Sequence, residues 1–306
     1  MSPDCNCTSQ NVSAPGSRTT LIRSGSFFRI SDQVRVQRYF CRLCKKSFSD
    51  STGTECFSQN KRHKNAAVLK LLVSCVSQRR SAFILKINRK TVVRKFLLMG
   101  KKAQFILPML NSRFDKCKTV EFDDLETFEH TNCKPLSVIL MTEFGTRRIL
   151  GFRVAQMPCK GTLAALSRKK YGKRKDHRGP ARKELFEELK DYIEADALIK
   201  SDENPHYTKD VKAHFPEAQH KVFKGRGARN GGQGELKKGG FDPLFTLNHT
   251  CAMWRANINR LVRKTWCTTK RPERLGYHIA LYSLFHNEKL LKLKQKDAAN
   301  TVMPSN

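Results

Sequence analysis

The order of hydrophobic patterns after Thr119 constrains the fold of this chain more than any other feature. Three extended runs come first, and helical spacing then alternates with short apolar runs as far as about residue 285. The expected elements are strands at Thr119–Phe122, Leu136–Met141 and Arg148–Gln156, a helix over 181–196, a strand at Ala197–Lys200, a helix at Pro205–Phe215, a strand at His220–Phe223, and helices at Leu244–Arg263 and Pro272–Phe285. This order predicts an α/β fold with a mixed sheet and helices on its faces.

Two smaller modules are predicted before the sheet. Residues 21–55 carry short alternating apolar and polar runs around turn residues, which is typical of small β-ribbons. From Lys61 to Lys102 the apolar residues recur at helical spacing instead. Pro108 and residues 111–113 are expected to form a linker to the sheet.

Residues 71–98 are arranged like a helix-turn-helix. Ser77 can cap a first helix, Ile87 and Asn88 form a turn, and a second helix starts near Asn88. In such a motif the second helix can enter the major groove of DNA. The alternative is a basic helical hairpin that only packs on its neighbour. The exposed basic residues expected to contact DNA are Arg79, Arg80, Arg89, Lys90 and Arg94, with Lys95 beside them.

The charge of the chain favours a nucleic-acid partner. Its 59 Lys and Arg residues against 27 Asp and Glu give a net charge of +32. Residues 1–102 hold 21 of the basic residues and four of the acidic ones, a net charge of +17, and no Asp or Glu occurs from 57 to 114. A solvated face usually carries both signs, whereas an excess of one sign on this scale is typical of proteins that bind a polyanion.

Membrane and exported proteins are excluded at this stage. The longest apolar stretches, such as Val138–Met141, are far too short to span a bilayer, and Met1–Pro15 lacks the apolar segment of a secretory signal. Eleven cysteines is an odd number for a disulfide framework. We therefore expect a reducing, cytoplasmic location in which any cysteine function is metal binding.

Cys41 and Cys44 form a C-x2-C pair that predicts a structural zinc site. Two thiols on one tight turn can both reach a single Zn²⁺ ion, and the flanking aromatic residues would cover it. A structural zinc needs four ligands, so two more are required. The candidates are Cys5 and Cys7, with Cys56 and His63 as the rival pair.

Carboxylates follow two of the expected strands and predict a site for Mg²⁺. Asp123 and Asp124 come directly after Val120 and Phe122, and Asp202 ends the run that begins at Ala197. Carboxylates held together at strand ends repel one another unless a cation lies between them. Two Mg²⁺ ions bridged by such an Asp can activate a water or a 3′-hydroxyl and stabilise the leaving oxygen in phosphodiester transfer.

Together these residues resemble a DDE-type transposase of a bacterial insertion sequence. The resemblance covers residues 37–287 and depends on the order of five features: QRYFCRLCKKSF, a helix-turn-helix, VEFDDLETF, IKSDENPHY and LNHTCAMWRANINRLVRKTWCTTK. It implies a zinc ribbon and a helix-turn-helix that bind the terminal inverted repeats of the element. It also implies an RNase H-like (retroviral-integrase-like) domain that cuts and joins DNA strands with Mg²⁺ or Mn²⁺. The implied boundaries are 1–58 for the ribbon, 59–105 for the helix-turn-helix, 115–288 for the catalytic domain and 289–306 for a basic tail.

The resemblance also assigns the catalytic residues by position. Asp123 matches the first acid of the family and Asp202 the second, and both would hold magnesium. The third acid falls in the stretch from Leu247 to Thr250, which has no carboxylate, so Asn248 takes its place. An amide oxygen can ligate Mg²⁺. The alternatives for this third ligand are Glu235, Asp242 and His249, and the helix that follows is expected to hold DNA through Arg255, Arg260, Arg263 and Lys264.

The expected function is therefore that of a transposase that binds terminal inverted repeats and catalyses metal-dependent strand cleavage and strand transfer. Its expected partners are double-stranded DNA, both the repeats and the target, and further copies of itself in a homodimer or higher oligomer on DNA. The expected location is the cytoplasm, at the nucleoid. The alternative is a non-catalytic, sequence-specific DNA-binding protein derived from such an element, because the third carboxylate is missing.

Overall fold

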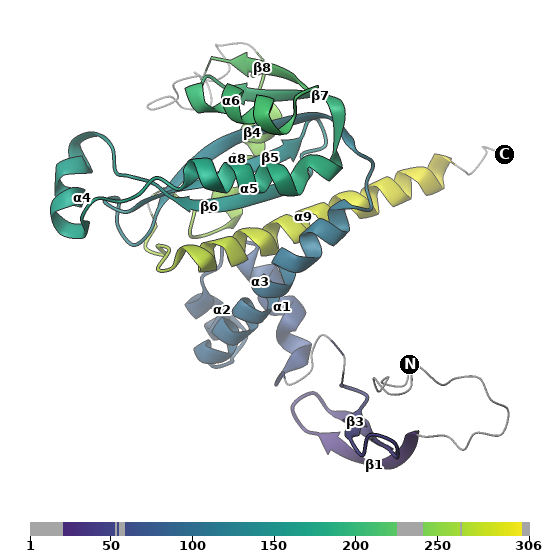
Figure 1. Cartoon of the computed structure of the whole chain (residues 1–306). Coiled ribbons are helices and arrows are strands. Elements are labelled where there is room, and N and C mark those ends of the chain that lie inside the picture. The colour runs from purple at the N-terminus through teal and green to yellow at the C-terminus, as the bar shows by residue number, and fades with distance from the viewer. Residues whose placement is uncertain (1–20, 53, 55–58, 225–240, 264, 302–306) are drawn as a thin grey trace. The chain divides into compact units, whose positions relative to one another are not determined.

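The computed structural model describes residues 21–52, 54, 59–224, 241–263 and 265–301 (Figure 1). Contacts divide the chain into two compact units, residues 1–67 and residues 68–306. Most of the segment expected as a separate helix-turn-helix module thus belongs to the same unit as the large sheet.

The first unit contains a small antiparallel sheet, as the alternating pattern predicts. Its strands are β1 (Leu21–Arg29), β2 (Val34–Cys41) and β3 (Ser47–Ser49), in that order. A short 3-10 helix (Arg62–Lys64) leads to α1. Among the described residues of this unit, the buried hydrophobic side chains are Val36 and Cys41. A core of this size is too small to stabilise an independent fold without further cross-linking.

The second unit contains a mixed five-stranded sheet with the strand order β6-β5-β4-β7-β8. The central strand β4 pairs antiparallel with β5 and parallel with β7, and β8 continues the sheet parallel to β7. The expected α/β class and mixed sheet are therefore confirmed. The strands are β4 (Cys117–Phe128), β5 (Pro135–Glu143), β6 (Ile149–Gln156), β7 (Ile193–Asp202) and β8 (Gln219–Phe223).

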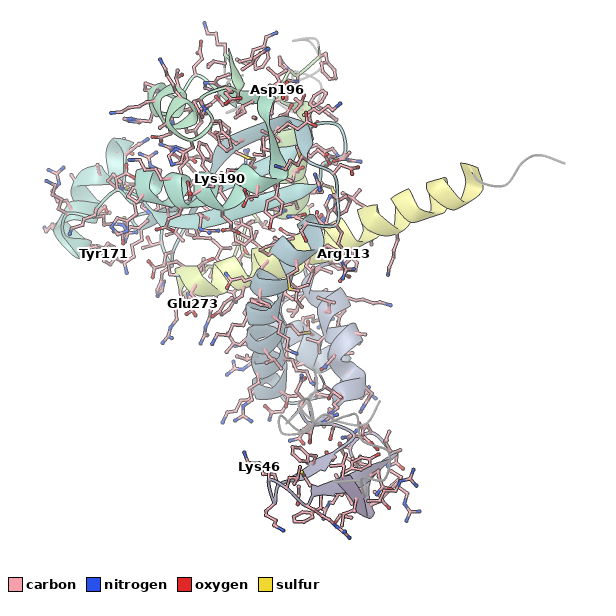
Figure 2. The ribbon with its side chains drawn as sticks, turned by 45° about the vertical axis from the view of Figure 1, so that its right-hand side comes forward. Lys46, Arg113, Tyr171, Lys190, Asp196 and Glu273 are labelled. Atoms are coloured by element: carbon pink, nitrogen blue, oxygen red, sulfur yellow. The ribbon has the colours of Figure 1, made fainter. Side chains whose placement is uncertain are left out.

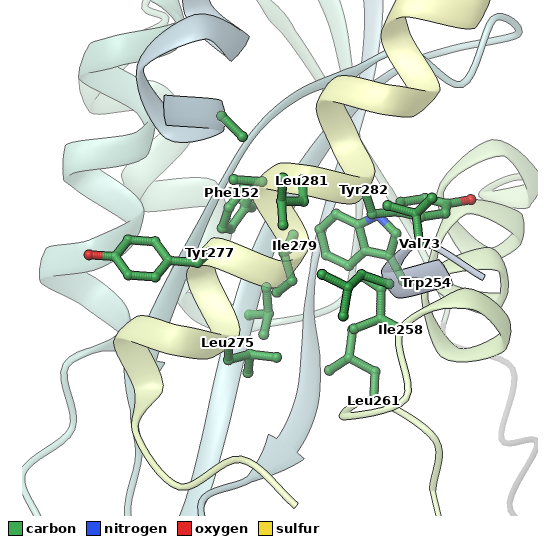
Figure 3. Close-up of a cluster of buried hydrophobic side chains, with 14 of the residues drawn as sticks. Val73, Phe152, Trp254, Ile258, Leu261, Leu275, Tyr277, Ile279, Leu281 and Tyr282 are labelled. Carbon is green, nitrogen blue, oxygen red and sulfur yellow. The ribbon is translucent and has the colours of Figure 1, made fainter. Parts of the chain in front are cut away.

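Helices cover both faces of this sheet. One face packs against α5 (Arg178–Leu189) and α6 (Pro205–His214) through a cluster that includes Phe122 and Tyr207. The other face packs against α3 (Arg89–Asn111), α8 (Phe245–Asn257) and α9 (Pro272–Thr301). Figure 3 shows this second cluster, in which Trp254, Ile258 and Leu261 meet the side chains of α9.

An arm projects from the sheet between β6 and α5 (Figure 1). It contains a 3-10 turn (Gly161–Leu163) and α4 (Ala164–Tyr171), whose final residue is labelled in Figure 2. The Ser167 hydroxyl donates to the carbonyl oxygen of Cys133 at 2.6 Å, which holds the arm to the β4–β5 hairpin.

The helix-turn-helix forms as the capping signals predict. It follows α1 (Asn65–Leu72) and consists of α2 (Gln78–Ile84) and α3 (Arg89–Asn111). The Ser77 hydroxyl accepts the backbone N–H of Arg80, and the Asn88 side chain accepts that of Lys90. These contacts satisfy N–H groups that have no partner inside the helix.

The end of α3 differs from the expectation. The helix continues through Pro108 to Asn111, beyond the predicted boundary at residue 105. The Asn111 side chain donates to the carbonyl oxygens of Ile149 and Leu150 and accepts from Asn287, so contacts with β6 and α9 hold the last turn. Sequence periodicity contains no information about such partners.

The two C-terminal helices also differ in length from the expectation. Helix α8 ends at Asn257, short of Arg263, because the Asn257 carbonyl accepts the backbone N–H of Cys75 and Ile258 is extended and buried. Helix α9 continues to Thr301, so residues 289–301 extend this helix and are not a separate tail. In the described part of the chain, no helix is both long and apolar enough to cross a membrane.

Gly100 allows α3 and α9 to cross closely. A Cβ atom at this position would lie 2.4 Å from the Cβ and 3.2 Å from the Cα of Tyr277. Backbone atoms cannot move away cheaply, so Gly100→Ala is expected to lower the free energy of unfolding by about 1–3 kcal/mol or more, the typical cost of overpacking. Urea denaturation measures this effect. Gly145→Ala is not a suitable control because its φ is +80°, whereas Gly179→Ala meets no atom within 4 Å and should have a much smaller effect.

Candidate active site

Asp123 and Asp202 lie on neighbouring strands. β4 and β7 are parallel, and Glu121 pairs with Lys200. The same register, continued by two residues, places Asp123 opposite Asp202. Paired strands are about 4.8 Å apart, so the two carboxylates are within reach of a shared cation.

The electrostatics of this pair favour a bound cation. Burial, followed by the charge of Asp202, raises the pKa of Asp123 to about 7. Burial also raises the pKa of Asp202, and the nearby charge of Glu203 adds to this effect. Carboxylates that are desolvated and close together are costly to ionise without a positive charge between them. A divalent cation would supply that charge, so this donor set fits the expected magnesium site.

Tyr207 fixes the orientation of Asp123. Its hydroxyl donates to Asp123 Oδ1 at 3.2 Å, and the backbone N–H of Asp124 donates to the same oxygen at 2.6 Å. The phenol ring is fully buried, with its centroid 4.7 Å from that of Phe122. Tyr207 was not among the residues predicted from the sequence. The sequence does contain a signal for its position, because Asn204 and the proline after it are typical of a helix start and place Tyr207 in the first turn of α6.

Asp124 belongs to the opposite face of β4 and has a different environment. Its carboxylate lies 3.9 Å from the Arg182 guanidinium, which is itself bound to Asp210 at 2.6 Å. Both Asp124 carboxylate oxygens are buried without a hydrogen-bond partner. Burial raises the pKa of Asp124, and the charge of Arg182 opposes this effect. The acidic pair of the sequence is therefore divided, with Asp123 beside Asp202 and Asp124 beside a buried arginine.

The start of α8 passes over β4, as the sequence analysis expects. The buried Glu121 carboxylate accepts the backbone N–H of Leu247 at 2.8 Å and so anchors the helix. Glu121 was not among the candidate residues, although strand alternation puts it on the same face as Asp123. One turn further along α8, burial and the charge of Asp123 raise the pKa of Cys251 to about 12.

The proposed third ligand makes a different contact. The Asn248 side chain is exposed, and its Nδ2 donates to Asp242 Oδ2 at 2.8 Å. Among the described residues, Asn248 makes no side-chain hydrogen bond to Asp123 or Asp202. His249 lies 3.2 Å from Arg147 on the β5–β6 hairpin, which makes it a poor candidate, and Glu235 lies outside the described residues. The identity of the third ligand stays a prediction.

The C-x2-C pair occupies a closed turn. The backbone N–H of Lys45 donates to the carbonyl oxygen of Cys41, and the backbone N–H of Cys41 donates to the carbonyl oxygen of Lys46. Both cysteines therefore lie on one tight turn. Such a turn suits two zinc ligands. The other candidates Cys5, Cys7 and Cys56 lie outside the described residues. Within the described ranges, no group of three or more His, Cys, Asp or Glu side chains is placed to hold a metal, so His63 does not complete a three-ligand set there.

The expected DNA-binding residues of the helix-turn-helix are exposed. Arg79 and Arg80 lie on α2, and Arg89, Lys90 and Arg94 lie on α3, all exposed to solvent. Lys95, which was expected beside them, is instead buried, with 4% of its surface exposed. Position 95 faces the apolar cluster because helical spacing puts it on the same side as Val92 and Phe96.

The basic residues at the end of α8 and in the segment after it differ in their surroundings. Arg255 is half-buried and Arg263 is exposed. The Arg260 guanidinium lies 5.6 Å from the centroid of the Phe96 ring, and burial lowers its pKa. Arg260 therefore packs against α3, and its assignment to a DNA-facing surface is not supported by this contact. Lys264 lies outside the described residues.

The raised pKa of Asp123 gives stability a predictable pH dependence. Between its ordinary pKa of 3.8 and its folded value of about 7, the native state binds more protons than the unfolded chain. The free energy of unfolding of the metal-free protein should therefore fall as pH rises across this window, and Asp123→Asn should make that fall shallower. Urea denaturation in EDTA at several pH values measures both slopes. Equal slopes for wild type and Asp123→Asn would show that the pKa of Asp123 is not raised in the folded protein.

The arrangement defines a class of site, namely two carboxylates on adjacent parallel strands with a buried tyrosine behind them. Scans against models of protein families and against curated proteins find no match for this chain. The function is therefore inferred from the geometry of the site together with the motifs.

Proposed function

We propose that the chain is a DDE-type transposase with Asn248 in the third catalytic position. The observation that carries the proposal is that Asp123, in the middle of β4, and Asp202, at the end of β7, lie on adjacent parallel strands. The neighbouring position of β4 and β7 in a mixed sheet supports an RNase H-like catalytic domain. The partners would be inverted-repeat and target DNA, with at least two copies of the chain on DNA in the nucleoid.

In this proposal Asp123 and Asp202 hold Mg²⁺ or Mn²⁺, which supplies activation of a water or 3′-hydroxyl and stabilisation of the leaving oxygen. Tyr207 keeps Asp123 in one orientation through its hydroxyl. Glu121 fixes the start of α8 over the site. The reaction would be hydrolysis at the transposon end, followed by in-line attack of the freed 3′-hydroxyl on target DNA.

A structural Zn²⁺ in the first unit is part of the same proposal. Cys41 and Cys44 would supply two thiolates, and the remaining ligands would come from Cys5 and Cys7. The small number of buried side chains in this unit supports the need for a metal, because small domains with little core generally require such a cross-link.

The direct test is strand cleavage by the full chain on DNA that carries the ends of its own element. Wild-type protein should nick these ends with Mg²⁺ or Mn²⁺, and EDTA should abolish the reaction. Protein that binds the ends tightly and never nicks them with either metal would overturn the proposal.

The helix-turn-helix gives a separate prediction for DNA binding. Arg89→Ala and Lys90→Ala at the exposed start of α3 should each weaken binding to the inverted repeat and reduce its salt dependence by about one counterion, because each removes one cation. Fluorescence anisotropy over a range of salt concentrations measures both quantities. Lys86→Ala, an exposed cation in the turn before α3, is the matched control. Equal losses on repeat and random DNA would indicate a phosphate contact and not a recognition helix.

A non-catalytic DNA-binding protein is the second candidate. One observation favours it. The Asn248 side chain donates a hydrogen bond to Asp242, where an active enzyme of this class would direct a third carboxylate toward Asp123 and Asp202. This candidate predicts tight repeat binding without metal-dependent nicking. Short inverted repeats with target-site duplications in the flanking DNA would instead indicate recent mobility.

A further inference from the structure

A cavity of about 380 Å³ opens at the second half of β4, the strand that carries Asp123. Its walls come from the second half of β4, from the chain around Cys159 at the base of the α4 arm, and from the segment that follows α8. All of these elements belong to the second unit. None of the roles assigned so far uses this cavity.

Three basic residues line the cavity. Arg255, Arg263 and Lys160 line it, with Glu126 as its acidic residue. Burial, followed by the charge of Arg263, lowers the pKa of Arg255, so the two guanidinium groups are close enough to repel one another. Neither arginine forms an ion pair with an acid among the described residues. Two guanidinium groups without an acidic partner favour an anion, and guanidinium matches phosphate geometry well.

Most of the remaining lining is apolar, with Thr127 and Asn132 as polar exceptions. Phe128, Met157 and Leu163 contribute to the wall, and Leu261 and Val262 continue it. A phosphate group alone gains nothing from such a wall, whereas a nucleobase stacks on apolar and aromatic side chains. The volume falls in the range of pockets that hold small ligands, about 300–1,000 Å³.

The cavity lies further along the strand that carries Asp123, although neither Asp123 nor Asp202 lines it. Glu126 lies three residues beyond Asp123 on β4. Arg255 lies one helical turn beyond Cys251, whose thiol is affected by the charges of both Asp123 and Arg255. Three residues of a strand span about 10 Å, so a DNA strand that passes Asp123 can reach the cavity within one or two nucleotides.

We propose that this cavity receives one unpaired nucleotide of the bound DNA strand, with its phosphate between Arg255 and Arg263 and its base against Phe128 and Met157. The inference rests on the proposed function, because it assumes that DNA occupies the site. It adds a requirement, namely that the duplex opens by one nucleotide next to the cleaved bond. Opening costs least where the base is already unpaired, so unpaired ends should bind best.

Cys159 lines the cavity and is partly accessible, so its thiol can report occupancy. The full chain is treated with a maleimide in EDTA, and alkylation of each cysteine is followed by peptide mass spectrometry. The probes are a short duplex with a single unpaired 3′ nucleotide and the same duplex with blunt ends. The overhang should protect Cys159 about fivefold or more better than the blunt duplex, the low end of the effect of base stacking. Cys267, which is half-buried outside the cavity, should show no such difference.

Two variants separate the parts of the inference. Arg263→Ala should reduce the extra protection by removing a phosphate contact, and Leu163→Trp should remove it by filling the cavity without changing its charge. Lys212→Ala on α6 removes one exposed cation elsewhere and should leave the extra protection intact. Equal protection by both duplexes, or none by either, would overturn the inference.

Because the assay contains no active metal, its outcome is independent of cleavage. Cleavage of element ends without selective protection of Cys159 refutes the nucleotide pocket and leaves the transposase proposal standing. Selective protection without cleavage by the Mg²⁺-loaded protein supports the pocket and refutes the catalytic proposal.

Discussion

Replacing Asp123 or Asp202 with asparagine is expected to reduce metal-dependent strand cleavage by on the order of a thousandfold, because metal stabilisation of the transition state contributes several kcal/mol. Each substitution keeps the shape of the side chain and removes the charge that holds the cation. The measurement is single-turnover nicking of element ends with Mg²⁺. Repeat binding in EDTA should stay within a few-fold of wild type, since neither residue lies on α2 or α3.

Glu203→Gln is the matched control for this experiment. It removes the same charge one residue from Asp202, at a position that is exposed. Its cleavage rate should be close to that of wild type. The folded stability of Asp123→Asn in EDTA should equal or exceed that of wild type, because burial raises the pKa of Asp123 and so disfavours its charged form. Cleavage at wild-type rates by Asp123→Asn would exclude this residue as a metal ligand.

Arg182→Met is expected to produce the largest loss of stability outside the hydrophobic core. The Arg182 guanidinium is buried between Asp210, at 2.6 Å, and Asp124, at 3.9 Å, and it also lies 4.9 Å from the centroid of the Tyr207 ring. Its removal leaves buried carboxylates without a compensating charge, which costs about 3–5 kcal/mol. Urea denaturation near neutral pH measures the loss.

Two further variants make this prediction specific. Lys190→Met breaks the exposed ion pair with Glu187 and should leave the free energy of unfolding nearly unchanged. Combining Arg182→Met with Asp210→Asn should recover part of the lost stability, since it removes one of the stranded charges. If Arg182→Met alone unfolds at the same urea concentration as wild type, the charges of Asp124 and Asp210 are not desolvated in the way that the structure indicates.

Arg182 also connects the stability of the fold to the geometry of the site. Its guanidinium covers the ring of Tyr207, and Tyr207 holds Asp123. The acidic side chains that make the site useful for a cation also make the metal-free site unfavourable, as the raised pKa values of Asp123 and Asp124 indicate. The arginine behind the strand offsets part of this cost without entering the face that would hold the cation.

Features that depend on neighbouring residues can be predicted from the amino-acid sequence. Ser77 and Asn88 cap their helices as predicted, because a cap is a contact between a side chain and a backbone group two or three residues away. The order of strands and helices predicted the mixed sheet, and Asp202 ends its strand as expected. Asp123 does not: β4 continues through it to Phe128, because pairing with β5 extends the strand beyond the apolar run. The correct predictions rest on patterns within one turn or one element.

Features that depend on distant residues follow from the three-dimensional packing. The hydroxyl of Tyr207 finds Asp123 across 84 positions of sequence, and Asn111 ends α3 by bonding to Ile149. Arg260 looks like a DNA contact in the sequence and instead covers Phe96, because α8 ends where its last carbonyl meets the chain between α1 and α2. A helical or alternating pattern states which face of an element is buried, but it contains no information about which element will cover that face.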